Sequence, residues 1–268
     1  MEVRNFLDMI HHKDRPNAQY YVEHIFDDFI DLCGDRLYGD DPSVVGGIGT
    51  LDGIPVTVIG QRKGRNITEH KEYNFSMSKP EGYRKILRLM KQAEKFKRPV
   101  ICFVDTHGAY PGREAEERGQ GNAIANCLME NMYLKTPIIS VLIGDGVSGG
   151  ALAVCIADVV LALEYATLTI ISPRGCGNIL HKDSSKELEI AAALKMQSAN
   201  LLELGVIDQI ITEPDGGAHT AANLMASLIS NNLKREIRSC QKVSTSKLVK
   251  KRVAKYRNIG KQYLRSEK

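Results

Sequence analysis

The chain has 268 residues, of which 43% are hydrophobic, and its 36 Lys or Arg and 32 Asp or Glu give a formal net charge of +4 at pH 7. This length and apolar content suffice to bury a large core, which excludes a disordered or fibrous protein. No apolar run is long enough to cross a bilayer, and the N-terminus lacks the basic-then-apolar order of a secretory signal, so we expect a cytoplasmic protein. The six scattered cysteines lack the spacing of a zinc site, and we expect no bound metal.

Patterns of apolar residues and turn signals predict an alternation of strands and helices after a lead-in over residues 1–19. The predicted strands are Val44–Leu51, Pro55–Gln61, Val100–Val104, Pro137–Ile143, Val159–Leu163, Thr167–Ile171 and Val206–Ile211. The predicted helices are Tyr20–Cys33, one from a capping box at Ser78 and Glu81 to Phe96, one from near Glu114, one after Gly149, Lys186–Leu204 and Ala221–Ile237, with residues 64–75 as a polar loop. The Asp52-Gly53 turn predicts a hairpin, and Gly205 a left-handed helix stop. This order indicates a layered α/β fold.

The positive charge is concentrated at the end of the chain. Residues 234–268 contain thirteen Lys or Arg and two Glu, which leaves 23 basic and 30 acidic side chains in the preceding 233 residues. Within a basic tail over residues 238–268, Val249, Val253, Tyr256, Gly260 and Tyr263 follow helical spacing. We expect a solvated or partner-docking helix rather than a nucleic-acid or membrane patch, because no RNA-binding motif accompanies it.

Two glycine-rich segments each join an apolar strand to a helix. They are DTHGAYPG, over residues 105–112, and GDGVSGGALA, over residues 144–153. The first N–H groups of a helix are unpaired and lie at the positive end of its dipole, and adjacent glycines let a ligand approach the backbone. Each junction is therefore a candidate anion or oxyanion site, although a plain connection is the commoner meaning of one such turn taken alone.

Eight motifs stand in a fixed order between residues 16 and 233. They are GDRLYGDD, VGGIGTLDGIPV, PEGYRK, DTHGAYPG, AEERGQ, GDGVSGGALA, ISPRGC and GVIDQIITEPDGGAH. Together they resemble the α subunit of bacterial acetyl-CoA carboxylase carboxyltransferase, a family with the crotonase-like ββα spiral form of the α/β fold. We place this carboxyltransferase domain at residues 20–237.

The resemblance implies a subunit that transfers a carboxyl group from carboxybiotin to acetyl-CoA, giving malonyl-CoA for fatty acid biosynthesis. The implied partners are a β subunit, in an α2β2 complex, the biotin carboxyl carrier protein and biotin carboxylase. The chain is then expected to hold no covalently bound cofactor, because carboxybiotin arrives on the carrier and the family's zinc belongs to the β subunit. Which acyl-CoA accepts the carboxyl group stays open.

The same resemblance assigns roles to residues of both glycine-rich segments. Gly149 and Gly150 map onto the paired amides that hold the biotin carbonyl oxygen, while the enolate of acetyl-CoA is stabilised by the β subunit. The implied substrate-binding residues are Gly108, Ala109, Gly146 and Val147. The basic side chains near PEGYRK, which are Arg84, Lys85, Arg88 and Lys91, have two possible roles, toward a nucleotide phosphate or, as we favour, on a solvated helix face.

The chain departs from the family pattern beside this site. His107 stands where proline is expected, Asp145 and Val147 replace Glu and Gly, and Arg174 stands where an acid is expected. The family's form of the ISPRGC segment is ISPEGC. The Trp that usually follows the next ILxx stretch is absent here, with His181 nearby, and the basic tail lies outside the common pattern. His107 is either a base or, more commonly for such a residue, a hydrogen-bonded structural histidine.

The sequence is also compatible with three alternative functions. A GxSxG hydrolase would use Ser148 with His219 and either Asp208 or Asp215, but the strand predicted to end at Ile143 leaves too many residues before a nucleophile elbow. Another crotonase-type reaction, hydration or decarboxylation, would use the acids Glu114, Glu116 and Glu117, which fit a solvated first helical turn better. A degenerate subunit would act as a scaffold or regulator through the basic tail.

Overall fold

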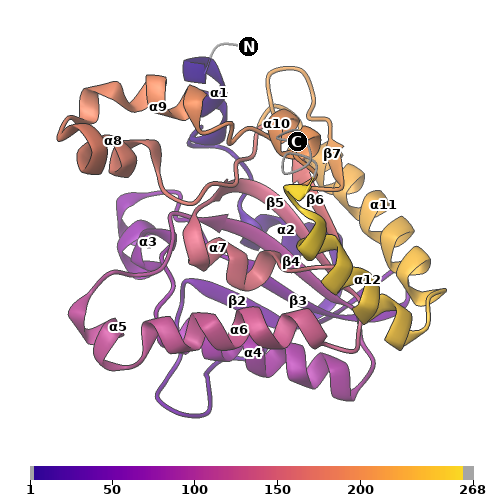
Figure 1. The fold of residues 1–268 in the computed structure, drawn as a ribbon. Helices are drawn as coiled ribbons and strands as arrows, with labels where there is room; N and C mark the ends of the chain where they lie inside the picture. Colours follow the sequence, from indigo (N-terminus) through magenta and orange to yellow (C-terminus); the bar gives the residue numbers. More distant parts are fainter. Residues whose placement is uncertain (1–2, 262–268) are drawn as a thin grey trace.

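The computed structural model describes residues 3–261, and within them the strands form a single seven-stranded sheet (Figure 1). The strands, which neighbour one another in sequence order, are β1 (Asp27–Asp31), β2 (Val44–Leu51), β3 (Ile54–Gln61), β4 (Val100–Thr106), β5 (Ile138–Gly146), β6 (Val159–Leu163) and β7 (Gln209–Ile211). The helices are α1 (Val3–Ile10), α2 (Ala18–Ile25), α3 (Ile67–Glu72), α4 (Pro80–Lys95), α5 (Arg113–Glu117), α6 (Gln120–Tyr133), α7 (Ser148–Cys155), α8 (Pro173–His181), α9 (Glu187–Ala193), α10 (Ser198–Glu203), α11 (Ala222–Gln241) and α12 (Thr245–Asn258), with 3-10 turns η1 (Asn74–Ser76) and η2 (Ser184–Lys186). None of these helices is long and apolar enough to span a membrane.

The sheet changes from antiparallel to parallel along its width. β1, β2 and β3 pair antiparallel, and β3 to β7 pair parallel. The hairpin predicted at Asp52-Gly53 is confirmed, with positive φ angles of 53° and 76° that this turn requires. Parallel strands need crossover helices, and these place the strand-to-helix loops at one edge, where the carboxyl ends of β4 and β5 lie.

Helices cover both faces of the sheet (Figure 1). Gly46 on β2 packs against Leu89 of α4, whereas Gly60 on β3 packs against Ala18 of α2, and the β2–β3 register places these two glycines on opposite faces. A Cβ at Gly46 would lie 2.5 Å from the Leu89 Cδ1, so glycine allows α4 to approach closely. Helices α4, α6 and α7 pack together on one side, and α2 packs with α11 on the other.

The helix predicted over Tyr20–Cys33 is wrong in its second half. α2 ends at Ile25, Phe26 is extended and packs on Phe103, and residues 27–31 form the edge strand β1. Pairing with the open edge of β2 gives residues 27–31 a strand conformation, because it satisfies backbone groups that β2 would otherwise expose.

Four further local predictions are corrected by the structure. Ser78 accepts a hydrogen bond from the Ser43 hydroxyl and Glu81 pairs with Arg118, so the expected capping box does not form. The polar loop at 64–75 contains α3 and η1. Segment 167–171 makes isolated bridges instead of a strand, and the helix predicted over 186–204 is broken where Gln197 pairs with Thr167.

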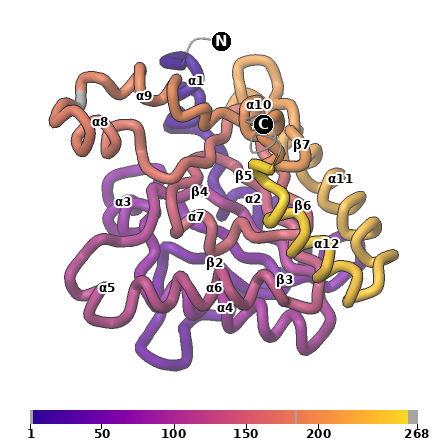
Figure 2. Tube along the Cα trace, in the orientation of Figure 1, coloured from indigo at the N-terminus to yellow at the C-terminus, as the bar shows by residue number. Residues whose placement is uncertain are grey.

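The lead-in and the tail both pack against the body of the protein. Arg15 is buried, donates to Ile143 O at 3.0 Å and forms a double hydrogen bond with Glu213 at 2.6 and 2.9 Å. Figure 2 shows α1 beside α9, far from it in sequence. The helix expected within the basic tail is α12, whose Arg252 is only 1% exposed and binds Asp158; Tyr263 lies outside the described residues.

Candidate functional site

The two glycine-rich segments meet at the carboxyl ends of β4 and β5. The pairing of these strands shifts register between Val104 and Thr106, so the segment after β4 and the segment before α7 diverge from the sheet there. Gly150 lies against the first segment, because a Cβ on it would be 2.6 Å from Gly108 C and 2.8 Å from Ala109 N. The structure therefore brings Gly108, Ala109, Gly149 and Gly150 together.

The first turn of α7 presents unpaired N–H groups. Among residues 3–261 no hydrogen-bond acceptor contacts the N–H of Gly149 or Gly150, whereas Ala151 N donates to Val147 O at 3.2 Å and starts the helical pattern. Gly149 is half-buried and Gly150 is buried. Two free amides at the positive end of a helix dipole form a site for an oxyanion.

Gly108 contributes shape rather than a hydrogen-bond donor. Its N–H donates to Thr106 Oγ1 at 3.0 Å, and its φ of 121° is reached readily only by glycine. Ala109 forms a parallel bridge with Ser78, and Gln120 Nε2 donates to both Ser78 O and Tyr110 O at 2.9 and 3.0 Å. The segment opposite α7 is thus held by a buried hydrogen-bond network.

Gly146 and Val147 lie at the base of this arrangement. A Cβ on Gly146 would be 2.7 Å from Thr167 O, and Val147 is 8% exposed and bridges to Thr169. Thr169 N donates to Gly146 O and Ser148 N donates to Thr169 O, both at 2.8 Å. The bulky Val147 is accommodated by packing, with its main chain fixed on both sides.

A buried charge cluster supports the strand ends behind the glycine-rich segments. Lys63 Nζ lies 3.1 Å from Asp145 Oδ2 and 3.5 Å from Asp105 Oδ1, and Asp145 N donates to Asp105 Oδ1 at 3.1 Å. His11 Nε2 and His107 Nδ1 lie 3.0 and 3.7 Å from the same Asp145 oxygen. The cluster ties β4 to β5 where their pairing is interrupted.

The charges of the cluster depend on one another. Burial opposes ionisation of Asp145, but the Lys63, His11 and His107 side chains outweigh burial and lower the pKa of Asp145 below its ordinary value. Burial likewise disfavours the Lys63 ammonium, while Asp105 and Asp145 raise its pKa. Burial, followed by repulsion from Lys63, lowers the pKa of His107. His107 is therefore neutral at pH 7, beside an ionised Asp145.

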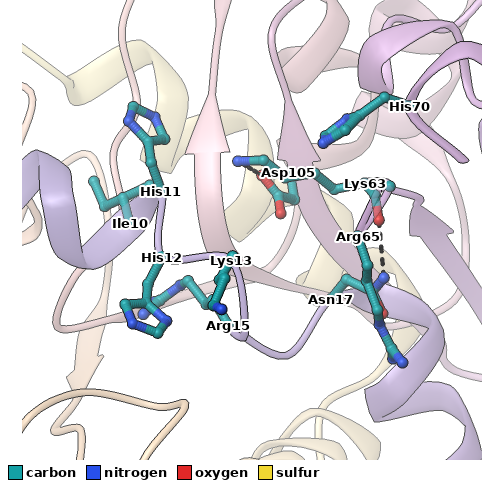
Figure 3. Close-up of a pocket in the computed structure, with 11 residues that line it drawn as sticks. Ile10, His11, His12, Lys13, Arg15, Asn17, Lys63, Arg65, His70 and Asp105 are labelled. Carbon is teal, nitrogen blue, oxygen red and sulfur yellow. Dashed lines mark hydrogen bonds and ion pairs between the residues drawn. The ribbon is translucent and has the colours of Figure 1, made fainter. Parts of the chain in front are cut away.

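A cavity of about 170 Å³ opens beside this cluster (Figure 3). Its lining comes from the lead-in, through His11, His12, Lys13, Arg15 and Asn17, and from residues that follow β3 or lie in β4 and α3, including Lys63, Arg65, His70 and Asp105. Asn17 Nδ2 donates to Lys63 O at 2.8 Å and joins the two walls. The N-terminal lead-in is consequently a structural part of the site region.

Three of the four basic side chains near PEGYRK bond within the protein, so the solvated helix face that we favoured for them is wrong for Arg84, Lys85 and Arg88. Lys85 is fully buried and pairs with Asp40 at 3.0 Å, Arg84 pairs with Asp35, and Arg88 donates to Leu32 O and Gly34 O. They hold the connection between β1 and β2 against α4. Lys91, paired with Glu130, and Arg174, on the first turn of α8, are exposed.

The alternative catalytic sets do not assemble. β5 extends to Gly146 and Ser148 has a φ of 59°, so the strand-length argument against a nucleophile elbow was wrong. Among the described residues, however, no side chain hydrogen-bonds to Ser148, His219 stacks on His12 at 3.6 Å, and Asp208 binds Val160 N at the opposite end of the parallel strands. The acids Glu114, Glu116 and Glu117 are exposed on the short helix α5, as expected for a solvated turn.

Comparison with known proteins decides the family. Residues 2–260 match the family described as "Acetyl co-enzyme A carboxylase carboxyltransferase-like". The chain is 52% identical to the carboxyl transferase subunit alpha of Clostridium botulinum (strain Eklund 17B / Type B), over 95% of this chain and 93% of that protein. The chain belongs to this family. It is also 50% identical to the alpha subunit of Bacillus subtilis (strain 168), over 92% of this chain and 76% of that protein.

The family assignment corrects one expectation and supports a second subunit. The match runs to residue 260, so α12 lies inside the family pattern, contrary to what the motifs suggested. A relative from Clostridium tetani (strain Massachusetts / E88), 48% identical over 95% of this chain and 44% of that protein, is named as the beta/alpha subunits in one polypeptide. An α subunit of this family is a carboxyltransferase component with a β partner.

Solved structures confirm the crotonase-like α/β fold. Transcarboxylase 12S superposes with a TM-score of 0.65 at 18% identity, over 84% of this chain and 43% of that chain. A Pseudomonas malonate decarboxylase hetero-tetramer in complex with coenzyme A superposes with a TM-score of 0.63 at 17% identity, over 75% and 81% of the two chains. The fold is shared although few residues are.

The motifs did not include Lys63 or Gln61, and they did not indicate a charge pair for Asp105, the first residue of DTHGAYPG. Lys63 and Asp105 form the buried cluster with Asp145, and Gln61 contacts the backbone of α7. A detectable signal existed, because each is a polar residue at or just beyond the carboxyl end of an apolar strand. Only the fold shows that the carboxyl ends of β3, β4 and β5 converge at α7.

Proposed function

We propose that the chain, in complex with a β subunit, transfers the carboxyl group from carboxybiotin on a carrier protein to acetyl-CoA, giving malonyl-CoA. The observation that carries this proposal is the pair of N–H groups of Gly149 and Gly150 in the first turn of α7, which have no acceptor among the described residues, in a chain of this family. The fused relative supports the β subunit as the partner, and we propose cytoplasmic assembly with the carrier and biotin carboxylase for fatty acid synthesis.

The proposed mechanism assigns charge stabilisation to the backbone of α7. Carboxybiotin supplies the carboxyl group, and its carbonyl oxygen gains negative charge when the N–C bond to that group breaks. The N–H groups of Gly149 and Gly150 donate to this oxygen, and the helix dipole adds to the stabilisation. The biotin anion then takes a proton from the methyl group of acetyl-CoA, and that carbon forms the new bond to the carboxyl group. Gly108 and Ala109 form the opposite wall, while Gly146 and Val147 set its base. The β subunit, which we propose carries the family's zinc, holds acetyl-CoA so that the two substrates meet at the interface.

The transfer is tested in reverse, with malonyl-CoA and free biotin as substrates. We expect formation of acetyl-CoA by the co-purified α/β complex and none by the α chain alone or without biotin. Acyl-CoA turnover by the isolated chain, or the absence of transfer with every β partner tried, would contradict the proposal. A panel of malonyl-CoA and its longer homologues identifies the acceptor.

The variant Ser148→Gly separates this function from a serine hydrolase. It removes the hydroxyl without straining the backbone, because Ser148 has a φ of 59°, a conformation that glycine adopts freely. We expect the variant to transfer the carboxyl group at a rate similar to the native complex. If the Ser148 hydroxyl were the nucleophile, its removal would abolish activity. Loss of transfer in a folded, assembled variant would assign Ser148 a role that the proposed mechanism lacks.

A further inference from the structure

Gln61 links the sheet to the helix that carries the free amides. It is the last residue of β3 and is fully buried, and its Nε2 donates to Gly150 O at 3.0 Å. Gly150 is 89 residues away in sequence. A side chain at the carboxyl end of one strand thus holds the backbone of a helix that follows another strand.

The start of α7 needs such a contact. Glycine weakens a helix, because it loses more backbone freedom on folding than any other residue, and the first turn of α7 contains the adjacent Gly149 and Gly150. On its other side Gly150 meets Gly108, Ala109 and the buried Tyr83 hydroxyl, which lies 2.8 Å from the position of a Cβ on Gly150. The Gln61 amide completes the enclosure of Gly150.

The orientation of the Gln61 amide carries an energetic cost. Its Oε1 is buried and has no hydrogen-bond partner among the described residues. Rotating the amide by half a turn would place Oε1 against Gly150 O, two acceptors in contact, so the orientation is set by Gly150. A buried acceptor without a hydrogen-bond partner destabilises the fold, and residues that retain such a cost cluster at functional positions.

We propose that Gln61 is a positioning residue that holds Gly150 so that the N–H groups of Gly149 and Gly150 converge on one oxygen atom. This inference rests on the proposed role of those two amides in transfer. Gln61 itself is buried and does not touch the substrate. Its loss moves the amides rather than removing them, and a misplacement of about 1 Å costs about 10²-fold in rate.

Two substitutions test the role in the α/β complex, with malonyl-CoA and free biotin as substrates. Gln61→Met keeps the length of the side chain but cannot donate, and we expect kcat to fall about 10²-fold, with KM for malonyl-CoA close to native. Gln61→Glu donates to Gly150 O only when its carboxyl group is protonated, so its activity relative to native should rise as the pH falls. Gln241→Met, an exposed change on α11, serves as the matched control.

The outcomes separate this inference from the proposed function. A folded, assembled Gln61→Met complex with native kcat, or a Gln61→Glu complex whose activity relative to native does not change with pH, would overturn the positioning role. If Gln61→Met does not assemble, the pH profile of Gln61→Glu decides. Native transfer by a Gly150→Ala complex would instead show that the amides are not the site, whatever the Gln61 variants do.

Discussion

Gly150 and Gly149 differ in what a single added methyl group would meet. A Cβ on Gly150 would lie 2.6 Å from Gly108 C, a backbone atom that cannot move aside, whereas a Cβ on Gly149 would lie 3.3 Å from the Ile124 Cγ2. We expect Gly150→Ala to separate the two segments, lower transfer by about 10²- to 10³-fold and cost about 1–3 kcal/mol of unfolding free energy. Gly149→Ala should lose less of both.

The measurements are kcat in the reverse transfer assay and urea unfolding of the same complexes. Gly121→Ala on α6, where a Cβ meets no atom within 4 Å, is the control and should keep native activity and be at least as stable as the native complex. Equal effects of the Gly149 and Gly150 changes would contradict a site formed by close contact with Gly108 and Ala109.

Helix α12 is attached through two buried side chains, Leu248 and Arg252, of which Arg252 makes the polar contacts. Arg252 binds Asp158 and donates to three carbonyl groups, those of Asn131, Leu134 and Thr136, at 2.7 to 3.0 Å. We expect Arg252→Met to lower the unfolding free energy by about 3–5 kcal/mol, because it leaves the Asp158 carboxylate buried without its partner. Urea unfolding measures the change.

Lys251→Met, exposed on the same helix, should change the unfolding free energy by less than about 0.5 kcal/mol. A similarly small effect of Arg252→Met would mean that the docked helix adds little to stability. The packing of α12 also explains why the basic tail gives no sequence signal of its role. In the sequence, the buried Arg252 cannot be told apart from the exposed basic residues around it, because all of them carry the same charge.

Elements fixed by local patterns were predictable, and elements fixed by distant contacts were not. The β2–β3 hairpin and the left-handed Gly205 follow from turn chemistry and are confirmed. β1 was missed because its strand conformation comes from pairing with β2 rather than from its own sequence. The glycines of the site were recognisable as motifs, whereas Gln61 contacts Gly150, 89 residues away, and Lys63 contacts Asp145, 82 residues away.

The charge cluster around Asp145 makes stability depend on pH through His107, whose side chain is 44% exposed. The pKa of His107 is lowered below its ordinary value near 6.5, mainly by burial and then by Lys63. Between the two values the unfolded chain binds more protons than the folded chain, so the unfolding free energy should fall as the pH drops below about 6.5. Above that pH the imidazole is neutral in both states, so its titration no longer changes the unfolding free energy.

His107→Asn should reduce this loss of stability, because its side chain cannot titrate. Unfolding free energies measured by urea titration at several values between pH 5 and pH 7.5 test the difference in slope between the variant and the native chain. His181→Asn, an exposed change at the end of α8, is the control. Parallel slopes for the native chain and His107→Asn would exclude His107 as a source of the acid sensitivity.

The ion pair between Arg15 and Glu213 also bears on how the chain is made. A ribosome adds Glu213 198 residues after Arg15, and the two backbone acceptors of this guanidinium, in Ile143 and Tyr165, 128 and 150 residues after it. Until Glu213 is added, the Arg15 guanidinium lacks its ion-pair partner. Until Asp145 is added, His11 lacks its own. Contacts this distant form slowly and late. The wall that the lead-in builds beside the site is therefore completed only when synthesis has passed the last strand, so a nascent chain stopped earlier carries both glycine-rich segments but not their enclosure.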